Sequence, residues 1–233
     1  MKSIAIITAR GGSKRIPGKN IKEFLGMPII AYSIKAAMDS GIFEEVMVST
    51  DSVEIADIAR HYGASVPFLR SEKTSNDYAT TAEVIAEVLS NYRDIGRQYD
   101  MLCCIYPTAP FVTADKLKKS IEIIEEKKGD SLMTVVRFSF PPQRGMYISD
   151  GKLMYVNQEY TKVRSQDLEP IYHDCGQFYF CRVPAFLKYN SLVTPNSVPY
   201  IMPEEEVQDI DTMSDWVLAE AKYKTFILGD GEK

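Results

Sequence analysis

A basic, glycine-containing stretch near the start of the chain combines residue types that bind phosphate groups. Residues 9–20 read Ala-Arg-Gly-Gly-Ser-Lys-Arg-Ile-Pro-Gly-Lys-Asn and directly follow a short apolar run at 3–8. At the end of a strand, backbone N–H groups and cationic side chains converge readily on a polyphosphate. The candidate groups are those of Gly11, Gly12, Arg10, Lys14, Arg15 and Lys19. The stretch matches neither the Walker A loop nor GxGxxG, and a solvated basic loop is the alternative interpretation.

Two aspartates near the other end of the chain have spacing that suits a metal ion. Asp209 and Asp211 are separated by one residue, so in an extended strand their carboxylates point to the same side. Such a pair binds hard cations such as Mg²⁺, which hold phosphates in turn. However, the segment reads Asp-x-Asp-Thr-x-x-Asp ahead of an expected helix at 214–226. From these residues alone, capping of that helix is the commoner explanation.

A third group of polar residues surrounds an expected apolar strand at 177–181. Its members are Arg164, Gln166, Asp167, His173, Asp174, Gln177 and Tyr179. So many polar groups beside an apolar strand suggest a site for a polar ligand, and a hydrogen-bonded turn is the alternative. His173 has no nearby second histidine or cysteine with which to bind a metal. The absence of GxSxG or a Ser-His-Asp arrangement argues against covalent hydrolysis.

The elements that must position these residues alternate between strands and helices. Apolar strands are expected at 3–8, 45–49, 101–106 and 131–136, and amphipathic helices at 28–41, 55–63, 84–92 and 117–124. This alternation predicts an α/β fold with a parallel sheet covered on both faces. Ligands in such folds gather at the carboxyl ends of the strands. The basic stretch, which follows the first strand, is therefore expected at that edge.

Residues 138–170 interrupt the alternation of strands and helices with prolines, an Asp-Gly turn and a polar stretch. We expect a small arm or lobe inserted into one domain that spans residues 1–233, because no linker or internal repeat marks a second domain. The last helix is expected at 214–226.

Composition restricts the class of protein further. The 233 residues carry 27 Lys and Arg against 32 Asp and Glu, a net charge of −5, which argues against nucleic acid as a partner. No apolar run approaches the ~18–20 residues of a membrane helix, so we expect a cytoplasmic protein without a membrane partner. The four cysteines show no CxxC spacing, which predicts reduced, mostly buried thiols.

Taken together, four motifs of this chain resemble those of the CMP-acylneuraminate synthetases, and they occur in the same order. They are Ala9-Arg10-Gly11-Gly12-Ser13-Lys14-x-Ile16-Pro17-x-Lys19-Asn20, Tyr106-Pro107-Thr108-Ala109-Pro110, Arg164-Ser165-Gln166-Asp167 and Asp209-Ile210-Asp211-Thr212. The resemblance implies a Rossmann-like nucleotidyltransferase fold, with a mostly parallel central sheet and helices on both faces. It also implies CTP and an acidic nine-carbon sugar as substrates, Mg²⁺ as cofactor, and a homodimer formed through the inserted lobe.

The resemblance also assigns roles by position. The groups that would meet the phosphates are Arg10, Gly11, Gly12, Ser13 and Lys19, and those that would frame cytosine and ribose are Asn20, Arg70, Ala79 and Thr81. The sugar site would comprise Tyr106, Gln143, Arg144, Arg164, Gln166, His173 and Gln177. Asp209 and Asp211 would hold the metal, and together with Arg10 and Lys19 they would form the catalytic set.

The sugar-side motifs bear on which nine-carbon acid is used. Tyr106 stands where sialate enzymes commonly carry Gln, and Cys175-Gly176 stands where they carry Asn-Gly. The sugar-side sequences are most similar to those of family members that activate pseudaminic acid, so that acid is the expected substrate. N-acetylneuraminate and legionaminate are the alternatives within the family. A non-catalytic nucleotide-sugar binding protein on the same fold is the alternative from another class.

Overall fold

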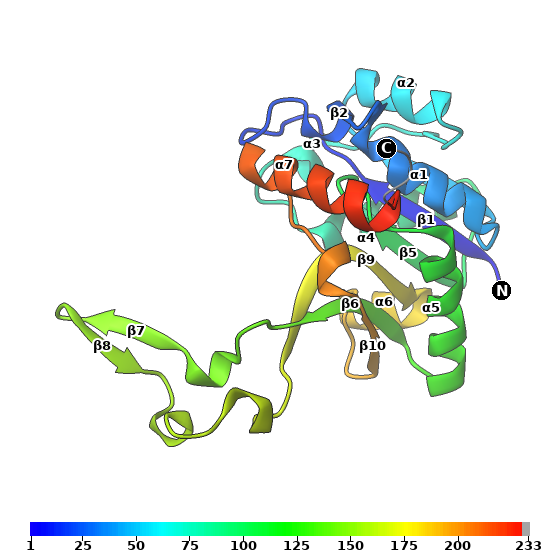
Figure 1. Ribbon diagram of the computed structural model, residues 1–233. Coiled ribbons are helices and arrows are strands. Elements are labelled where there is room, and N and C mark those ends of the chain that lie inside the picture. The colour runs from blue at the N-terminus through cyan, green and yellow to red at the C-terminus, as the bar shows by residue number, and fades with distance from the viewer. Residues whose placement is uncertain (230–233) are drawn as a thin grey trace.

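The computed structural model describes residues 1–229, which fold around a six-stranded mixed sheet (Figure 1). The strands follow the order β10 (Ser197–Ile201), β6 (Ser131–Arg137), β9 (Tyr172–Arg182), β5 (Met101–Ile105), β1 (Ser3–Thr8) and β4 (Glu45–Ser49). β9 pairs antiparallel with β5 and β6, and the other neighbours pair parallel. The amino-terminal half of β9 therefore lies at the sheet edge where β5 and β6 end.

Helices cover both faces of the sheet, as the apolar strands require. Along β1, Ala5 and Ile7 face one core cluster, while Ile4 and Ile6 face another. The first cluster includes residues of α1 (Ile29–Ser40), α2 (Val53–His61) and α5 (Ala114–Lys127), and the second includes residues of α4 (Thr81–Asp94) and α6 (Val183–Tyr189). The predicted α/β class and the predicted mostly parallel sheet are confirmed.

Three parts of the fold were not anticipated from the sequence. β9 begins at Tyr172 rather than 177 and runs antiparallel. α6 and β10 lie in a region for which no element was predicted. A small hairpin, β2 (Glu23–Phe24) with β3 (Met27–Pro28), precedes α1. The final helix, α7 (Met213–Lys222), ends earlier than expected and continues as a π-helical turn at Tyr223–Ile227.

A third apolar cluster joins the two ends of the described chain. Phe24 is fully buried, and its ring lies 5.4 Å from that of Tyr32 and 5.6 Å from that of Trp216, both edge-on. Ile16, in the basic stretch, and Ile210, between the two aspartates, belong to the same cluster. The cluster thus fixes the basic stretch and the aspartate segment against the same set of rings.

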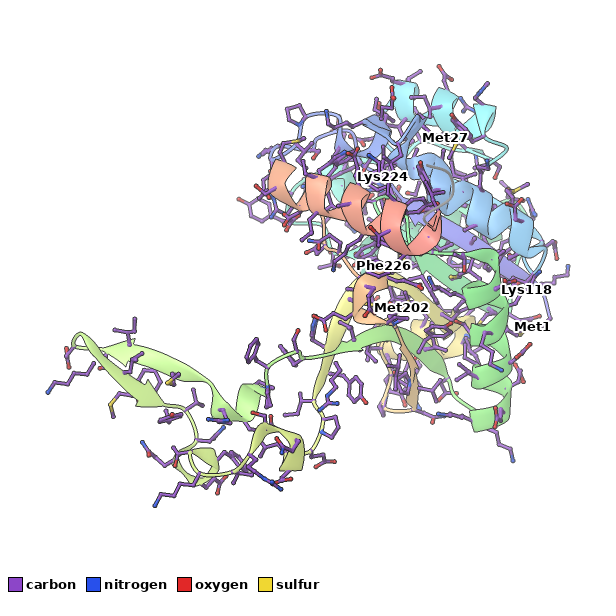
Figure 2. All side chains as sticks on the ribbon, in the orientation of Figure 1. Met1, Met27, Lys118, Met202, Lys224 and Phe226 are labelled. Atoms are coloured by element: carbon purple, nitrogen blue, oxygen red, sulfur yellow. The ribbon has the colours of Figure 1, made fainter. Side chains whose placement is uncertain are left out.

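The chain between β6 and β9 leaves the sheet as an extended arm, residues 138–171 (Figure 1). Its outer part is the antiparallel pair β7 (Met146–Ser149) and β8 (Lys152–Tyr155), followed by short 3-10 turns. Figure 2 shows that most of the arm, with its side chains, stands clear of the body of the molecule. Many large apolar side chains here are exposed, among them Phe140, Met146, Tyr147, Ile148, Leu153 and Val156. Within residues 1–229, no helix has the length and apolar character needed to span a bilayer.

We predict that Phe24→Ala destabilises the protein by about 3–5 kcal/mol, because the truncation leaves a cavity beside the rings of Tyr32 and Trp216. Urea denaturation followed by circular dichroism measures the change. Val217→Ala, on an exposed part of α7, is the control and should change stability by less than about 0.5 kcal/mol. A loss below about 1 kcal/mol for Phe24→Ala would show that this cluster does not hold the two segments.

Candidate active site

Two cavities open where β1 and β5 end. The first has a volume of about 420 Å³ and is lined by Thr8, Arg10, Ser13, Lys14, Arg15, Lys19, Asn20, Thr81, Tyr106, Pro107 and Thr108. The second has a volume of about 450 Å³ and is lined by Tyr106, His173, Asp174, Cys175, Gly176, Tyr179, Val207, Gln208 and Asp209. Tyr106 lines both cavities. A ligand that fills both would therefore pass along the Tyr106 ring.

The first cavity collects most of the residues predicted to bind the nucleotide. Arg10, Ser13, Lys19, Asn20 and Thr81 all line it. The backbone geometry of the basic stretch depends on Asn20, whose buried amide donates to the Arg10 carbonyl at 2.9 Å. Asn20 thus fixes the strand-to-loop transition as well as facing the cavity.

The remaining predicted nucleotide residues lie outside the lining of this cavity. Gly11 donates its N–H to Asp51 Oδ1 at 2.8 Å, and Gly12 is exposed. Arg70 donates to the Ser49 carbonyl at 2.6 Å, at the end of β4, and burial lowers its pKa. Ala79 belongs to the turn ahead of α4. Their roles toward a nucleotide stay predictions.

The aspartate segment lies against the basic stretch. Lys19 Nζ donates to the Ile210 carbonyl at 2.6 Å and lies 3.5 Å from Asp211 Oδ1. Arg15 Nη1 lies 2.6 Å from Asp211 Oδ2. Burial, followed by the nearby charge of Asp211, raises the pKa of Asp209. The two carboxylates therefore disfavour each other's charge, and cations from the basic stretch offset that repulsion at Asp211.

Helix capping in this segment uses other residues than the aspartate pair. Thr212 is the N-cap of α7, and a reciprocal capping box links it to Asp215. The capping pattern in the sequence is thus real, but Asp209 and Asp211 are not its members. Within residues 1–229, no cluster of three or more His, Cys, Asp or Glu side chains forms a complete metal site. A metal ion here would need further oxygen ligands, such as phosphate oxygens or water.

The second cavity receives part of the predicted sugar set. Tyr106 and His173 line it. Gln177 does not, because its buried amide donates to the Glu206 carbonyl at 2.7 Å. That bond holds the loop leading to Asp209. Gln177 is therefore a buried residue that braces this loop and is not part of the cavity lining.

Four predicted sugar residues lie on the arm. Gln143 donates to the Glu169 carbonyl at 2.7 Å, and Arg144 contacts Ser165 at 3.1 Å. Arg164 forms a two-bond ion pair with Asp167, at 2.7 and 3.1 Å. Gln166 lies in the same 3-10 turn as Asp167. Within residues 1–229, the linings of the two cavities include no arm residue, so the chain does not bring these four to its own site.

A tyrosine pair adds to the second cavity beyond the predicted set. Tyr179 donates its hydroxyl to Asp174 at 2.7 and 2.8 Å, and its ring lies 5.5 Å from that of Tyr106. Burial raises the pKa of both phenols, so both remain neutral donors. Asp174 and Tyr179 stood out as polar groups in the sequence. Their pairing depends on the path of β9, which local sequence does not reveal.

Asp77 is a further residue that the sequence did not single out. Its carboxylate pairs with Arg10 and Lys14 at the mouth of the first cavity. The partners lie 67 and 63 residues away. No local spacing rule could have found this contact.

Comparison with known proteins identifies the family. Residues 4–198 match the family model described as Cytidylyltransferase. The chain is 41% identical over 225 residues to a pseudaminic acid cytidylyltransferase of Campylobacter jejuni, covering 96% of this chain and 97% of that one. It is 36% identical over 228 residues to a CMP-N,N'-diacetyllegionaminic acid synthase of Legionella pneumophila, covering 94% and 95%.

The fold agrees with that identification. A CMP:2-keto-3-deoxy-manno-octonic acid synthetase, solved in complex with CTP, superposes with a TM-score of 0.68 at 16% identity, covering 95% of this chain and 98% of that one. At such low identity the likeness concerns the fold alone. The sequence matches establish the family as well as the fold. The family model covers residues 4–198, and the two relatives match nearly the whole length of both chains. The chain therefore belongs to the cytidylyltransferase family.

Proposed function

We propose that this protein transfers CMP from CTP to the 2-hydroxyl of a nonulosonic acid, most effectively pseudaminic acid, and releases pyrophosphate. The observation that carries the proposal is the meeting of two cavities at Tyr106, one lined by cations and one bordered by Asp209. A triphosphate suits the first cavity, and a polar sugar suits the second. The 41% identity to a pseudaminic acid cytidylyltransferase supports the same substrates.

The reaction would be an in-line attack on the α-phosphorus, so alignment and charge neutralisation are the main tasks of the protein. Arg10 and Lys19 would stabilise charge on the α-phosphate and on the departing pyrophosphate. The backbone of the basic stretch would add N–H donors. No covalent intermediate with a side chain is needed. Tyr106 would separate the nucleotide from the sugar and orient both.

Asp209 and Asp211 have the donor set for Mg²⁺. Both offer carboxylate oxygens. Burial first, and the charge of Asp211 second, raise the pKa of Asp209, and a divalent cation would compensate both effects. Mg²⁺ held there would polarise the α-phosphate and lower the pKa of the attacking hydroxyl. Arg15 and Lys19, which pair with Asp211 in this structure, would then turn to phosphate oxygens.

We further propose that the protein is a single domain whose arm joins two copies into a homodimer. The exposed apolar side chains of the arm, such as Ile148 and Leu153, need a partner surface. A second copy would also explain why Arg164 and Gln166 lie away from their own cavities: each arm would reach the other copy's sugar site. Buried free thiols fit a reducing, cytoplasmic location.

Two other functions are weaker candidates. Activation of legionaminate or N-acetylneuraminate is the second candidate, because the Legionella relative shares 36% identity. A non-catalytic nucleotide-sugar binding protein has no use for both a cationic stretch at the cavity and a carboxylate pair beside it. The contact of Lys19 with the Ile210 carbonyl places those two features side by side, which favours catalysis.

The first prediction concerns the sugar. Pseudaminate should be used better than N-acetylneuraminate by roughly 10²-fold or more in kcat/KM, because a phenol leaves polar groups of the wrong sugar unpaired. Pyrophosphate release is measured in parallel with both acids at equal CTP and Mg²⁺. Equal or faster turnover of N-acetylneuraminate would rule out the pseudaminate assignment. No turnover with any nonulosonic acid would refute the enzymatic proposal itself.

The second prediction concerns the carboxylate pair. Asp211→Asn should lower kcat by at least about 10²-fold at saturating Mg²⁺, and Asp209→Asn by a similar or smaller factor, because a charged metal ligand is lost. Circular dichroism checks that the fold is retained. Asp94→Asn, an exposed change at the end of α4, should keep full activity. Near-normal turnover of both site variants would mean that the pair does not hold the metal.

The third prediction tests the arm in trans. Arg164→Ala and Asp211→Asn should each be nearly inactive alone. Co-expressed, they should recover about a quarter of wild-type activity, because half of the dimers are mixed and each mixed dimer holds one intact site. Light scattering checks for a mass of two chains. If the co-expressed variants recover no activity while mixed dimers are present, the arm serves its own chain.

A further inference from the structure

The cations of the first cavity share a carboxylate partner that no role has so far explained. Arg10 Nη1 lies 2.7 Å from Asp77 Oδ1, and it also donates to the Asn76 carbonyl at 3.3 Å. Lys14 Nζ pairs with the other oxygen, Oδ2. Each carboxylate oxygen thus takes one cation. This is the arrangement that two oxygens of a phosphate group would make with the same side chains.

The loop that carries Asp77 is held in place without these ion pairs. The Asn76 side-chain oxygen accepts the N–H groups of Tyr78 and Ala79 at 2.8 and 3.0 Å. Directly after the loop, Thr80 and Glu83 form the capping box of α4. Removing the charge of Asp77 therefore leaves the loop its own supports. A substitution there tests the charge rather than the loop conformation.

The root of the same loop has a separate anchor. The Glu87 carboxylate of α4 accepts the N–H and hydroxyl of Ser71, at 2.8 and 2.7 Å, and the hydroxyl of Thr74 at 2.5 Å. Thr74 is buried. The segment from residue 71 to the start of α4 is therefore fixed at both ends.

The ion pairs themselves are accessible to competing anions. The side chains of Arg10 and Asp77 are 38% and 41% exposed, and that of Lys14 is 78% exposed. Hydrogen bonds from Lys14 and then from Arg10 lower the pKa of Asp77, so the carboxylate stays ionised at neutral pH. Exposed pairs of this kind are weak. A polyphosphate of higher charge can replace the carboxylate.

We propose that Asp77 is a competing counterion at the phosphate site: its carboxylate pairs with Arg10 and Lys14 until the phosphates of the substrate displace it. The Asp77 carboxylate pairs with Arg10 and Lys14 again when pyrophosphate leaves. This inference rests on the proposed function in assigning the first cavity to a triphosphate. Asp77 then lowers the affinity for both triphosphate and pyrophosphate, and so speeds product release.

If Asp77 had a purely structural role, the opposite change in polyphosphate affinity would be expected when its carboxylate is removed. If the carboxylate served only to orient Arg10 and Lys14, its loss would let both side chains move, and polyphosphate would bind more weakly. If it competes with the ligand, its loss leaves two uncompensated cations, and polyphosphate binds more tightly. The sign of the change therefore decides between the two roles.

The test is isothermal titration calorimetry of the full chain with inorganic tripolyphosphate and with pyrophosphate, both in EDTA without metal. Asp77→Asn should tighten the binding of both anions by about three- to tenfold. Arg10→Ala should weaken it. Asp57→Asn is the control for net charge, because Asp57 pairs with Arg60 on the solvent-facing side of α2, and it should change either affinity by less than about twofold.

The outcomes separate this inference from the proposed function. Unchanged or weaker binding by Asp77→Asn overturns the displacement role, as does a failure of the wild-type chain to bind tripolyphosphate. Neither anion requires cytosine, sugar or turnover, so the result stands whichever sugar is used. In an assay that follows formation of the CMP-sugar, added pyrophosphate should also inhibit Asp77→Asn at an about three- to tenfold lower concentration than wild type, by the same competition.

Discussion

The contact on which the whole site depends is the hydrogen bond from Lys19 Nζ to the Ile210 carbonyl, at 2.6 Å. It joins a loop at the start of the chain to a segment 191 residues later. Ile210 is itself buried in the cluster around Phe24, so the bond is anchored on an apolar base. One ammonium thereby fixes the position of a carbonyl whose two neighbours in sequence are the aspartates. Cations of the basic stretch and the aspartate segment are thereby held next to each other.

Carboxylates partly compensate the cations of the basic stretch, two carboxylates against four cations. Arg10 and Lys14 pair with Asp77, while Arg15 and Lys19 pair with Asp211. Four cations in one loop would repel one another strongly if they had no counterions. The two carboxylates, of Asp77 and Asp211, are in direct contact with these cations. Both are partly exposed, so the phosphates of a ligand can replace them. When a metal-bound triphosphate binds, ion pairs between these cations and phosphate oxygens would replace the ion pairs with Asp77 and Asp211.

The sequence predicted some elements of the fold and the site well and others not at all. The apolar runs at β1, β4, β5 and β6 were located within about a residue, because a strand buried on both faces has no polar interruptions. The cationic stretch and the aspartate pair were found by residue type. The direction of β9 was not, since antiparallel pairing depends on partners remote in sequence. The pairing of Asp77 with Arg10, the contact between the rings of Tyr179 and Tyr106, and the bond from Gln177 to the Glu206 carbonyl were not predicted for the same reason. No local pattern records a contact between distant segments.

The antiparallel direction of β9 lowers the conformational cost of inserting the arm between β6 and β9. Arg137, at the end of β6, is paired with Tyr172, at the start of β9, so the arm is topologically a long hairpin loop closed by a ladder that already exists. The entropic cost of closing such a loop rises only by about 0.6 kcal/mol for each doubling of its length. Segments of very different size can therefore be spliced in at this point while the sheet keeps its register. The sheet thus sets no narrow limit on the length of the arm, and the phosphate site does not depend on that length.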